Sequence, residues 1–292
     1  DSDYPQLLLE IPDPPTVLYY RGQIEVLRQL DRGIGISIVG TRDLSDYGRR
    51  WTRKLSARLA QQGFFVMSGL ADGIDAEAHR SCLEVGGITI AVLGTGVDLV
   101  YPATNRKLYA QLLETGLALS EYPAGTQPDR THFPRRNRIV AGLSRAVLVI
   151  EAAKRSGALI TANLANDYGR DVYVLPGNLD QPKSYGCLTL LNRGAHPILG
   201  EDELLETLGE LPQLDKPQQI QTQLPLLDLS PELSKILQTI QAIAQQANNI
   251  SVPLDLIVQY TEMPTATVTS SLLQMELLGL VTQVPGMRYQ LC

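Results

Sequence analysis

Short apolar runs alternate with longer amphipathic stretches from Ile36 onward. The runs are rich in β-branched residues and end in glycine or a small polar residue. They lie at 36–40, 64–69, 89–94, 117–122, 146–152 and 171–177. Apolar runs without polar alternation are typical of strands that are buried on both faces of a parallel sheet. The sequence therefore predicts an α/β fold with a mostly parallel, doubly wound sheet and helices on both faces.

The stretch after the first run has helical spacing. Trp51, Leu55 and Leu59 fall at i, i+4 and i+8, whereas the basic residues between 49 and 54 fall on the other faces. Such a stripe predicts an amphipathic helix that packs against the sheet. Gly63 follows as the predicted stop.

The two ends of the chain differ in composition from this central part. The prolines of PDPPTVLYYRG at 12–22 oppose helix formation, so residues 1–35 are predicted to be an extended lead-in and connector. Residues 36–210 form the predicted α/β domain. Residues 211–229 are rich in Pro and Gln, which predicts a linker.

A separate module is predicted at 230–292. Ser230 is the expected N-cap of its first helix, and two further helical patterns follow. Pro285 and Gly286 are the expected turn of a closing hairpin. Three helices and a hairpin predict a winged helix. Its apolar residues at helical spacing are expected to form a small core, and they are Leu254, Ile257, Val268, Leu272, Leu273, Met275 and Leu277.

Composition limits the classes of function. The 292 residues are 44% hydrophobic and 19% charged, with a net charge of −6. The chain is therefore not a polycation, and any nucleic-acid binding must come from a local patch. Cys82, Cys187 and Cys292 form no CxxC pair, which argues against a disulfide framework and a structural zinc and favours a reducing cytoplasm. No apolar run approaches the roughly 20 residues of a membrane span, and no signal peptide is evident.

An arginine-rich segment stands out against this acidic background. Arg135, Arg136 and Arg138 lie between Phe133 and Leu143, together with Asn137. Guanidinium groups beside an aromatic ring are suited to phosphates and stacked bases of single-stranded nucleic acid. The same pattern also fits a solvated, positively charged helix face. The segment alone leaves both interpretations open.

Further polar and glycine residues follow the predicted strands. Gly40, Thr41 and Arg42 come after the first strand, and Ser68 and Gly69 come after the second. Ligands bind at the carboxyl ends of such strands, so VGTR before a helix is a candidate phosphate cradle with Arg42 as the clamp. The alternative is that these glycines serve only tight strand-to-helix turns.

Motifs of common enzymes are missing. GTGVDL has Leu99 where a dinucleotide fingerprint needs its third glycine, and no Walker A sequence or nucleophile elbow is present. Asp72, Asp75 and His79 fall roughly on one side of a predicted helix, either as an acid/base or metal set or as capping residues. The expectation is a protein without catalytic residues, metal or cofactor.

Seven successive motifs resemble those of the bacterial DNA-processing protein A family, DprA or Smf. They are VGTR (39–42), SGLADGIDAEAH (68–79), LGTGVDLVYPATN (93–105), SEYPAGTQP (120–128), FPRRNRIVAGLS (133–144), EAAKRSGALITANLA (151–165) and LPGN with SYGCLTLLNRGA (184–195). Members often begin with a small helical domain, and this sequence starts just after the expected end of such a domain. Leu188 stands where members commonly have asparagine.

The resemblance implies an extended Rossmann-like domain that binds and protects single-stranded DNA, forms a homodimer and loads the RecA recombinase in natural transformation, without catalysis. It implies that Arg42 holds a phosphate and that Arg130 lies near the groove lined by Phe133, Asn137 and Arg138. Lys154, Arg155 and Ser156 before GALITANLA either extend this track or belong to a helix start at SGALITA that needs glycine for packing. The predicted DNA-binding set is Gly40, Thr41, Arg42, Ser68, Gly69, Arg130, Phe133, Arg135, Arg136, Asn137, Arg138, Lys154, Ser156 and Gly157.

Two alternative classes of function have their own sequence signatures. A nucleotide-binding enzyme or sensor of the lysine-decarboxylase-like Rossmann group would carry PGGxGTxxE, which is absent here. A sequence-specific regulator would bind duplex DNA through helix 265–278, but that helix has no cation, so it would lack the counterion-release contribution to affinity. The module is instead expected to contact protein or the chain's own basic groove. Self-association is expected near 187–198.

Overall fold

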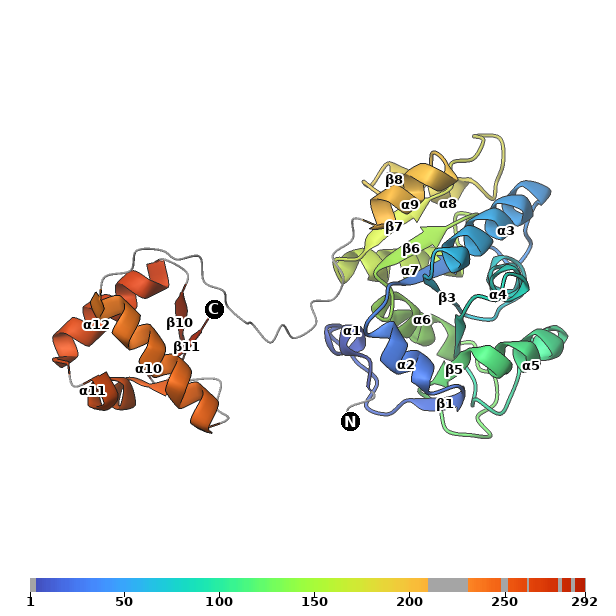
Figure 1. Ribbon diagram of the computed structural model, residues 1–292. Helices are drawn as coiled ribbons and strands as arrows, with labels where there is room; N and C mark the ends of the chain where they lie inside the picture. Colours follow the sequence, from blue (N-terminus) through green and yellow to red (C-terminus); the bar gives the residue numbers. More distant parts are fainter. Residues whose placement is uncertain are drawn as a thin grey trace. The chain divides into compact units, whose positions relative to one another are not determined.

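The computed structural model describes residues 4–209, 231–247, 252–261, 263–277, 280–284 and 287–291. The chain divides into two compact units, 1–216 and 217–292. Figure 1 shows both units, and each is described by itself. The predicted linker at 211–229, the expected N-cap Ser230 and the turn at Pro285 and Gly286 lie outside the described residues.

An eight-stranded sheet forms the centre of the first unit. Its strands are β1 (Tyr19–Gly22), β2 (Gly35–Val39), β3 (Phe65–Ser68), β4 (Thr89–Leu93), β5 (Leu117–Ser120), β6 (Ala146–Val149), β7 (Asp171–Val174) and β8 (His196–Pro197). They follow the order β1-β5-β4-β3-β2-β6-β7-β8. Only β1 is antiparallel to its neighbour within this described sheet, with Tyr19 opposite Ser120. The six predicted strands and the mostly parallel sheet are confirmed.

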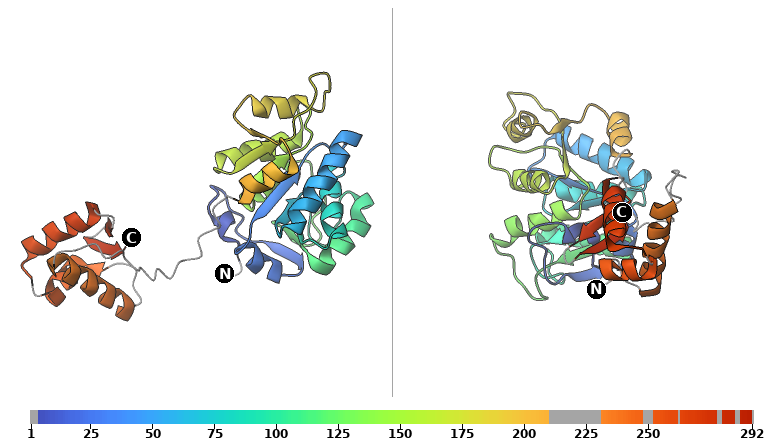
Figure 2. Two further views of the ribbon diagram at one scale, coloured as in Figure 1. Left: turned by 45° about the horizontal axis from the view of Figure 1, so that its top comes forward. Right: turned by 90° about the vertical axis from the view of Figure 1, so that its left-hand side faces the viewer.

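Helices cover both faces of the sheet (Figure 1, Figure 2). One apolar core contains side chains of α1 (Gln6–Leu9), α2 (Glu25–Leu30), α6 (His132–Gly142), α7 (Gly157–Asp167) and α8 (Tyr185–Leu191). The cores of the opposite face contain side chains of α3 (Asp46–Gln61), α4 (Ile74–Glu84), α5 (Arg106–Thr115) and α9 (Glu201–Gly209). A short 3₁₀ helix, η1 (Ala103–Asn105), precedes α5.

The amphipathic helix predicted after the first strand is α3. Its Leu55 and Leu59 are fully buried, and Trp51 packs against the same core. The Ser45 side chain caps the helix by accepting a hydrogen bond from the Gly48 backbone at 3.1 Å. The apolar stripe therefore faces the sheet as the sequence predicts.

The prediction that residues 1–35 form an extended lead-in is wrong for two parts of that segment, Gln6–Leu9 and Glu25–Leu30. The segment carries α1 and α2 as well as the extended edge strand β1. Leu7, Leu8 and Ile11 are buried. The prolines at 12–15 oppose helix only locally, and the leucines before them bury enough apolar surface to fix α1 against the unit.

The topology places a switch point between β2 and β6. From β2 the chain builds β3, β4 and β5 on one side, and β6, β7 and β8 lie on the other. Loops that leave β2 and β6 therefore diverge to opposite faces and leave a crevice at the carboxyl edge. This edge is where a ligand site is expected in such a sheet.

The second unit has its own core. It contains α10 (Pro231–Ala247), β9 (Val252–Pro253), α11 (Leu254–Thr261), α12 (Thr265–Leu277), β10 (Val281–Val284) and β11 (Arg288–Leu291). β10 pairs with β11 in an antiparallel hairpin, which matches the predicted winged helix. Leu254, Ile257, Val268, Leu272 and Met275 are buried as predicted.

One predicted core residue of this unit is not buried. Leu273 on α12 is 60% exposed. It follows Leu272 directly, and adjacent helical residues point about 100° apart, so only one of the two leucines faces the core. The side chain of Leu277 lies outside the described residues. Among the helices that the structure describes, none has the length and apolarity that a bilayer crossing requires.

Candidate functional site

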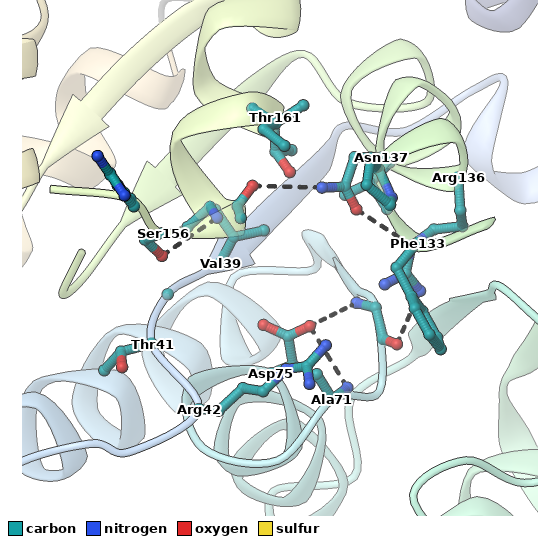
Figure 3. Close-up of a pocket in the computed structure, with 18 of the residues that line it drawn as sticks. Val39, Thr41, Arg42, Ala71, Asp75, Phe133, Arg136, Asn137, Ser156 and Thr161 are labelled. Atoms are coloured by element: carbon teal, nitrogen blue, oxygen red, sulfur yellow. Dashed lines mark hydrogen bonds between the residues drawn. The ribbon is translucent and has the colours of Figure 1, made fainter. Parts of the chain in front are cut away.

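A pocket of about 700 Å³ lies at the carboxyl edge of the sheet, at the switch point. The loops after β2, β3 and β6 line it together with α6 and the start of α7. Figure 3 shows Arg42, Phe133, Asn137, Ser156 and Thr161 around this space. The pocket therefore collects residues from segments that are more than a hundred positions apart in the sequence.

Exposed cations surround the pocket. Arg42 comes from the loop after β2, Arg130 from the segment before α6, and Arg155 from the loop after β6. All three side chains are exposed. No hydrogen bond or ion pair of theirs occurs with another described residue. We call Arg42, Arg130 and Arg155 the rim of the pocket; their donors are free for an anionic ligand.

An aromatic pair stands beside the rim. The Tyr101 and Phe133 rings stack with centroids 5.4 Å apart and an interplanar angle of 29°. The Arg42 guanidinium carbon lies 5.9 Å from the Phe133 ring centroid. Tyr101 is 43% exposed. An exposed aromatic surface beside free arginines can stack a flat ring while the arginines hold its phosphate.

Arg136 lines the same pocket but is buried. Its Nη1 donates to the Gly69 carbonyl at 2.8 Å and to the Val92 carbonyl, and its Nε donates to Asn137 Oδ1 at 3.2 Å. Burial lowers the pKa of Arg136 to about 10, opposed by the charge of Asp75. Arg136 thus joins α6 to the ends of β3 and β4. We call Arg136 and Asp75 the floor of the pocket.

Asp75 holds the loop after β3. Its Oδ2 accepts hydrogen bonds from the backbone of Gly69 at 3.1 Å and of Ala71 at 3.4 Å. Burial raises the pKa of Asp75, and the nearby Arg136 guanidinium opposes that rise. Because Asp75 sits in the first turn of α4, its charge also suits the helix dipole. Its partners belong to the end of β3 and the loop after it, which indicates a role in holding that loop.

Close backbone approach shapes the pocket at two glycines. Gly73 has φ of +84°, and a Cβ there would collide with the carbonyl groups of Thr41 and Arg42. A Cβ on Gly69 would collide with the Arg136 guanidinium. Glycine is therefore required at 73 so that the loops after β2 and β3 can pack together. This packing sets the position of Arg42.

Glu151, at the end of β6, holds the other side of the Arg42 loop. Its carboxylate accepts hydrogen bonds from the Ser45 backbone at 2.9 Å and from the Ser45 hydroxyl. Its backbone carbonyl accepts a hydrogen bond from Thr41 at 2.8 Å. Glu151 is buried, and its charge lies at the N-terminus of α3, where the helix dipole stabilises it.

The start of α7 forms the opposite wall. Ser156 caps the helix by accepting a hydrogen bond from Ala158 at 3.3 Å. Asn137 on α6 donates its side-chain amide to the Gly157 carbonyl at 3.3 Å, which ties α6 to α7. Thr161 is buried and lines the pocket (Figure 3). The Asn137 amide therefore ties the wall on α7 to α6, the helix that also carries the floor residue Arg136.

Not every predicted DNA-binding residue lines the pocket. The structure brings together Gly40, Thr41, Arg42, Gly69, Arg130, Phe133, Arg136, Asn137, Ser156 and Gly157. It leaves out Ser68, Arg135, Arg138 and Lys154. Ser68 is buried and donates to the Ile38 carbonyl at 2.6 Å. Arg135 is exposed, with its Nε 3.6 Å from Glu121.

Arg138 is turned away from solvent. Its Nη1 and Nη2 each donate to the Glu121 carboxylate at 2.8 Å, and its Nε donates to Asp13 Oδ2 at 3.1 Å. The side chain is 8% exposed. The expectation that Arg138 lines the groove therefore does not match its position. The Arg138 guanidinium group is bound by the carboxylates of Glu121 and Asp13. Arg138 therefore links the N-terminal segment to α6.

Tyr101, Ala71, Arg155 and Thr161 line the pocket outside the predicted set. An available signal for Tyr101 is the aromatic residue within LGTGVDLVYPATN, one of the motifs of the resemblance. Thr161 carries no such signal, because a threonine inside an apolar helical stretch is indistinguishable from a core residue by pattern alone.

The set Asp72, Asp75 and His79 does not form a site. Asp72 accepts a hydrogen bond from Thr104 at 2.9 Å, and His79 Nδ1 lies 2.6 Å from the Thr89 hydroxyl. That hydroxyl donates to the Val66 carbonyl, so the imidazole is the donor in the other bond. Burial lowers the pKa of His79 to about 3. Within the described residues no cluster of three His, Cys, Asp or Glu side chains could hold a metal ion.

Comparison with known proteins gives consistent matches. The family described as DNA recombination-mediator protein A matches residues 1–209, and the DprA winged helix domain matches residues 221–287. Protein Smf of Synechocystis is 49% identical over 99% of this chain and 78% of its own length.

Two solved structures resemble the first unit. DNA processing protein A of Streptococcus pneumoniae is 42% identical, with a TM-score of 0.67 over 70% of this chain and 71% of that chain. DNA processing protein A of Helicobacter pylori is 33% identical, with a TM-score of 0.65 over 70% of this chain and 92% of that chain, and its structure was described for its single-stranded DNA binding mode.

Proposed function

The chain belongs to the DNA recombination-mediator protein A family, also called DprA or Smf, and from this premise we propose that it binds single-stranded DNA in the pocket at the switch point. The observation that carries the proposal is the free, exposed Arg42 beside the stacked Phe133 and Tyr101 rings. The Helicobacter pylori relative, described as a single-stranded DNA binder, supports the same choice of ligand.

The arrangement suits a ligand of any base sequence. The rim arginines can hold backbone phosphates, which position a strand without reporting its sequence. The Tyr101–Phe133 pair can stack any base, because every base has a π face. Arg136 and Arg138 are engaged by protein groups and do not take part. The affinity is therefore expected to depend strongly on salt concentration and only weakly on base sequence.

In the cell we propose a role without catalysis. The protein would protect single-stranded DNA in the cytoplasm and load the RecA recombinase on it, in recombination and natural transformation, as the family resemblance implies. The hydrogen bonds of Asp75 to the loop backbone, and the position of His79 outside the pocket lining, support binding rather than acid/base chemistry at this pocket. RecA filament formation on single strands, measured with and without the protein, tests this role.

Self-association through the last part of the first unit remains a proposal. Leu190 and Ile198 are buried in the unit's own core, so the surplus of apolar surface expected from them is absent. Leu188 and Leu191 are half-buried, while Leu199 is 74% exposed. Light scattering at tens of micromolar, roughly the range of weak homodimers, should give a dimer mass. A strict monomer would contradict the proposal.

We also propose that the second unit does not bind duplex DNA. The exposed residues of α12 include Thr265, Thr269, Ser270, Leu273 and Gln274. Lys235 and Arg288 are the only cations in the sequence from Pro225 onward, against five acidic residues. A helix without cations gains nothing from counterion release on a duplex. A protein partner, or the basic groove of the chain itself, fits this surface better.

Fluorescence anisotropy with three ligands tests the proposed function. Labelled single strands, blunt duplexes and a mononucleotide are titrated at two salt concentrations. Single strands should bind best, with an affinity that falls steeply as salt rises. Equal binding to the blunt duplex, or an affinity unaffected by salt, would contradict the proposal.

A further inference from the structure

A further aromatic residue, in addition to Tyr101 and Phe133, lies outside the pocket lining beside the loop after β6. Tyr185 opens α8 and is 50% exposed. The Lys154 ammonium lies 5.4 Å from the centroid of its ring. The Tyr185 hydroxyl makes no hydrogen bond with any residue that the structure describes. The ring is thus an exposed flat surface next to a cation, which is the combination found at the Phe133 and Arg42 side of the pocket.

The backbone beneath Tyr185 is fixed. Gly186 donates to the Ala152 carbonyl at 2.8 Å, and Ala152 donates to the Lys183 carbonyl at 2.7 Å. A Cβ on Gly186 would collide with the Ala152 carbonyl, so the start of α8 can approach this loop only with glycine at 186. The next residue, Cys187, is buried beneath the loop. The backbone position of Tyr185 is therefore set before any ligand arrives.

The loop that carries Lys154 also lines the pocket. Ala153 and Arg155, on either side of Lys154, are pocket residues. Lys154 itself is not one of them and contacts Tyr185 instead. A strand that leaves the pocket past Arg155 therefore meets Lys154 and Tyr185 next. Both Lys154 and Arg155 are exposed, so a phosphate backbone is attracted along this path.

We propose that Tyr185 and Lys154 form a second stacking platform, which holds a nucleobase and the adjoining phosphate of single-stranded DNA outside the pocket. We call this pair the outer platform. The inference rests on the proposed single-strand binding and extends it by giving the strand a direction, from the Phe133 side across Arg155 to α8. The protein then covers a longer stretch of DNA than the pocket alone can hold.

The test is an affinity series against oligothymidylates from about two to about twenty nucleotides, a span chosen around known single-strand site sizes. Tyr185→Ala should match the wild type on the shortest ligands and bind the longest ones about five- to tenfold more weakly, as expected for one lost base stack. Tyr185→Phe should restore wild-type affinity at every length, because it keeps the ring.

The salt dependence separates the two residues. On long ligands, Lys154→Ala should reduce the steepness of the plot of log affinity against log salt. The reduction should correspond to the loss of about one phosphate contact. Tyr185→Ala should leave that slope unchanged, since stacking releases no counterion. Tyr20→Ala is the matched control, because Tyr20 is also 50% exposed but lies on β1 at the opposite edge of the sheet.

Two outcomes would overturn the outer platform. Tyr185→Ala would bind all lengths like the wild type and the Tyr20→Ala control, or it would lose affinity equally at all lengths. In each case the wild type would still show single-strand binding, so the proposed function would stand. Failure of the wild type to bind any single strand would instead overturn the proposed function. Each variant should have the same mass by light scattering and the same melting temperature as the wild type, so that a change in affinity reflects DNA contacts alone.

Discussion

Arg136 and Arg42 line the same pocket, yet the floor arginine is 5% exposed and the rim arginine is exposed to solvent. Arg136 donates hydrogen bonds to the Gly69 and Val92 carbonyls and to the Asn137 side chain. Arg42 makes one contact with a described side chain, over the Phe133 ring. The same guanidinium group therefore builds the pocket in one place and remains free for a ligand in the other.

The difference shows that arginine density alone does not locate a phosphate site. The densest cluster of the sequence, at 135–138, contributes one buried arginine to the pocket and another to the Glu121 and Asp13 pair. Solitary arginines on loops, at 42, 130 and 155, supply the free donors. The N–H groups of a buried guanidinium are already hydrogen-bonded to protein acceptors in place of water. Few of them remain available to bind a ligand.

The largest expected effect is on the floor. Arg136→Met should lower the free energy of unfolding by about 3 kcal/mol, because it removes the Arg136 hydrogen bonds to the buried Gly69 and Val92 carbonyls and the cation near Asp75. Urea denaturation measures the change. Arg135→Met, at a side chain that is 62% exposed, is the control and should cost less than about 1 kcal/mol. An equal decrease in the free energy of unfolding for both variants would show that Arg136 contributes no more to stability than the exposed Arg135.

On the rim, Arg42→Ala should weaken single-strand binding by roughly 1–3 kcal/mol and leave the melting temperature unchanged, because a charge-assisted contact to phosphate is lost while no internal hydrogen bond is. Arg42→Lys should recover part of the affinity. Arg21→Ala, an exposed arginine on β1 at the far edge, is the matched control for anisotropy titration. Normal binding by Arg42→Ala would make the VGTR turn a purely structural feature.

Behind the floor, His79 should make stability depend on pH. Its folded-state pKa is lowered to about 3 by burial, with the Arg136 charge acting in the same direction. The unfolded state, with a pKa near 6.5, therefore binds the extra proton as pH falls, and stability drops below about pH 6.5. Between pH 7 and pH 5 this contribution is about 2 kcal/mol.

Comparing wild type with His79→Gln isolates that contribution. Urea denaturation at pH 7, 6 and 5 should show that the variant loses less stability on acidification, by about the amount given above. The absolute stability of the variant at pH 7 does not enter the comparison. Identical slopes for the two proteins would show that His79 is not held neutral in the folded state.

The smallest effect is expected from removing the second unit, because the pocket and its rim are built from residues of the first unit. A chain ending at Gly209 should bind single strands within about 0.5 kcal/mol of the full chain, or slightly more tightly if the acidic unit competes for the rim. Anisotropy titration of both chains measures the difference. A large loss of affinity by a truncated chain that still melts cooperatively would assign DNA binding to the winged helix.

Much of the fold could be predicted because its signals are local. The six buried strands and the stripe of Trp51, Leu55 and Leu59 follow from the apolar pattern. The N-terminal segment could not be predicted in the same way. Its prolines are a strong local signal against helix, whereas the burial of Leu7, Leu8 and Ile11 depends on a surface that the rest of the chain provides.

For the candidate site, the sequence determined the types of residue and their place at strand ends. Glycine at 40 and 69, arginine at 42 and the aromatic at 133 all stand where a parallel sheet exposes its loops. Only the tertiary structure decided which arginines are free. Arg138 meets Glu121 and Asp13 from distant segments, and Arg136 meets the ends of β3 and β4. Burial and pairing are properties of the assembled fold, so residues with the same side chain acquire different roles.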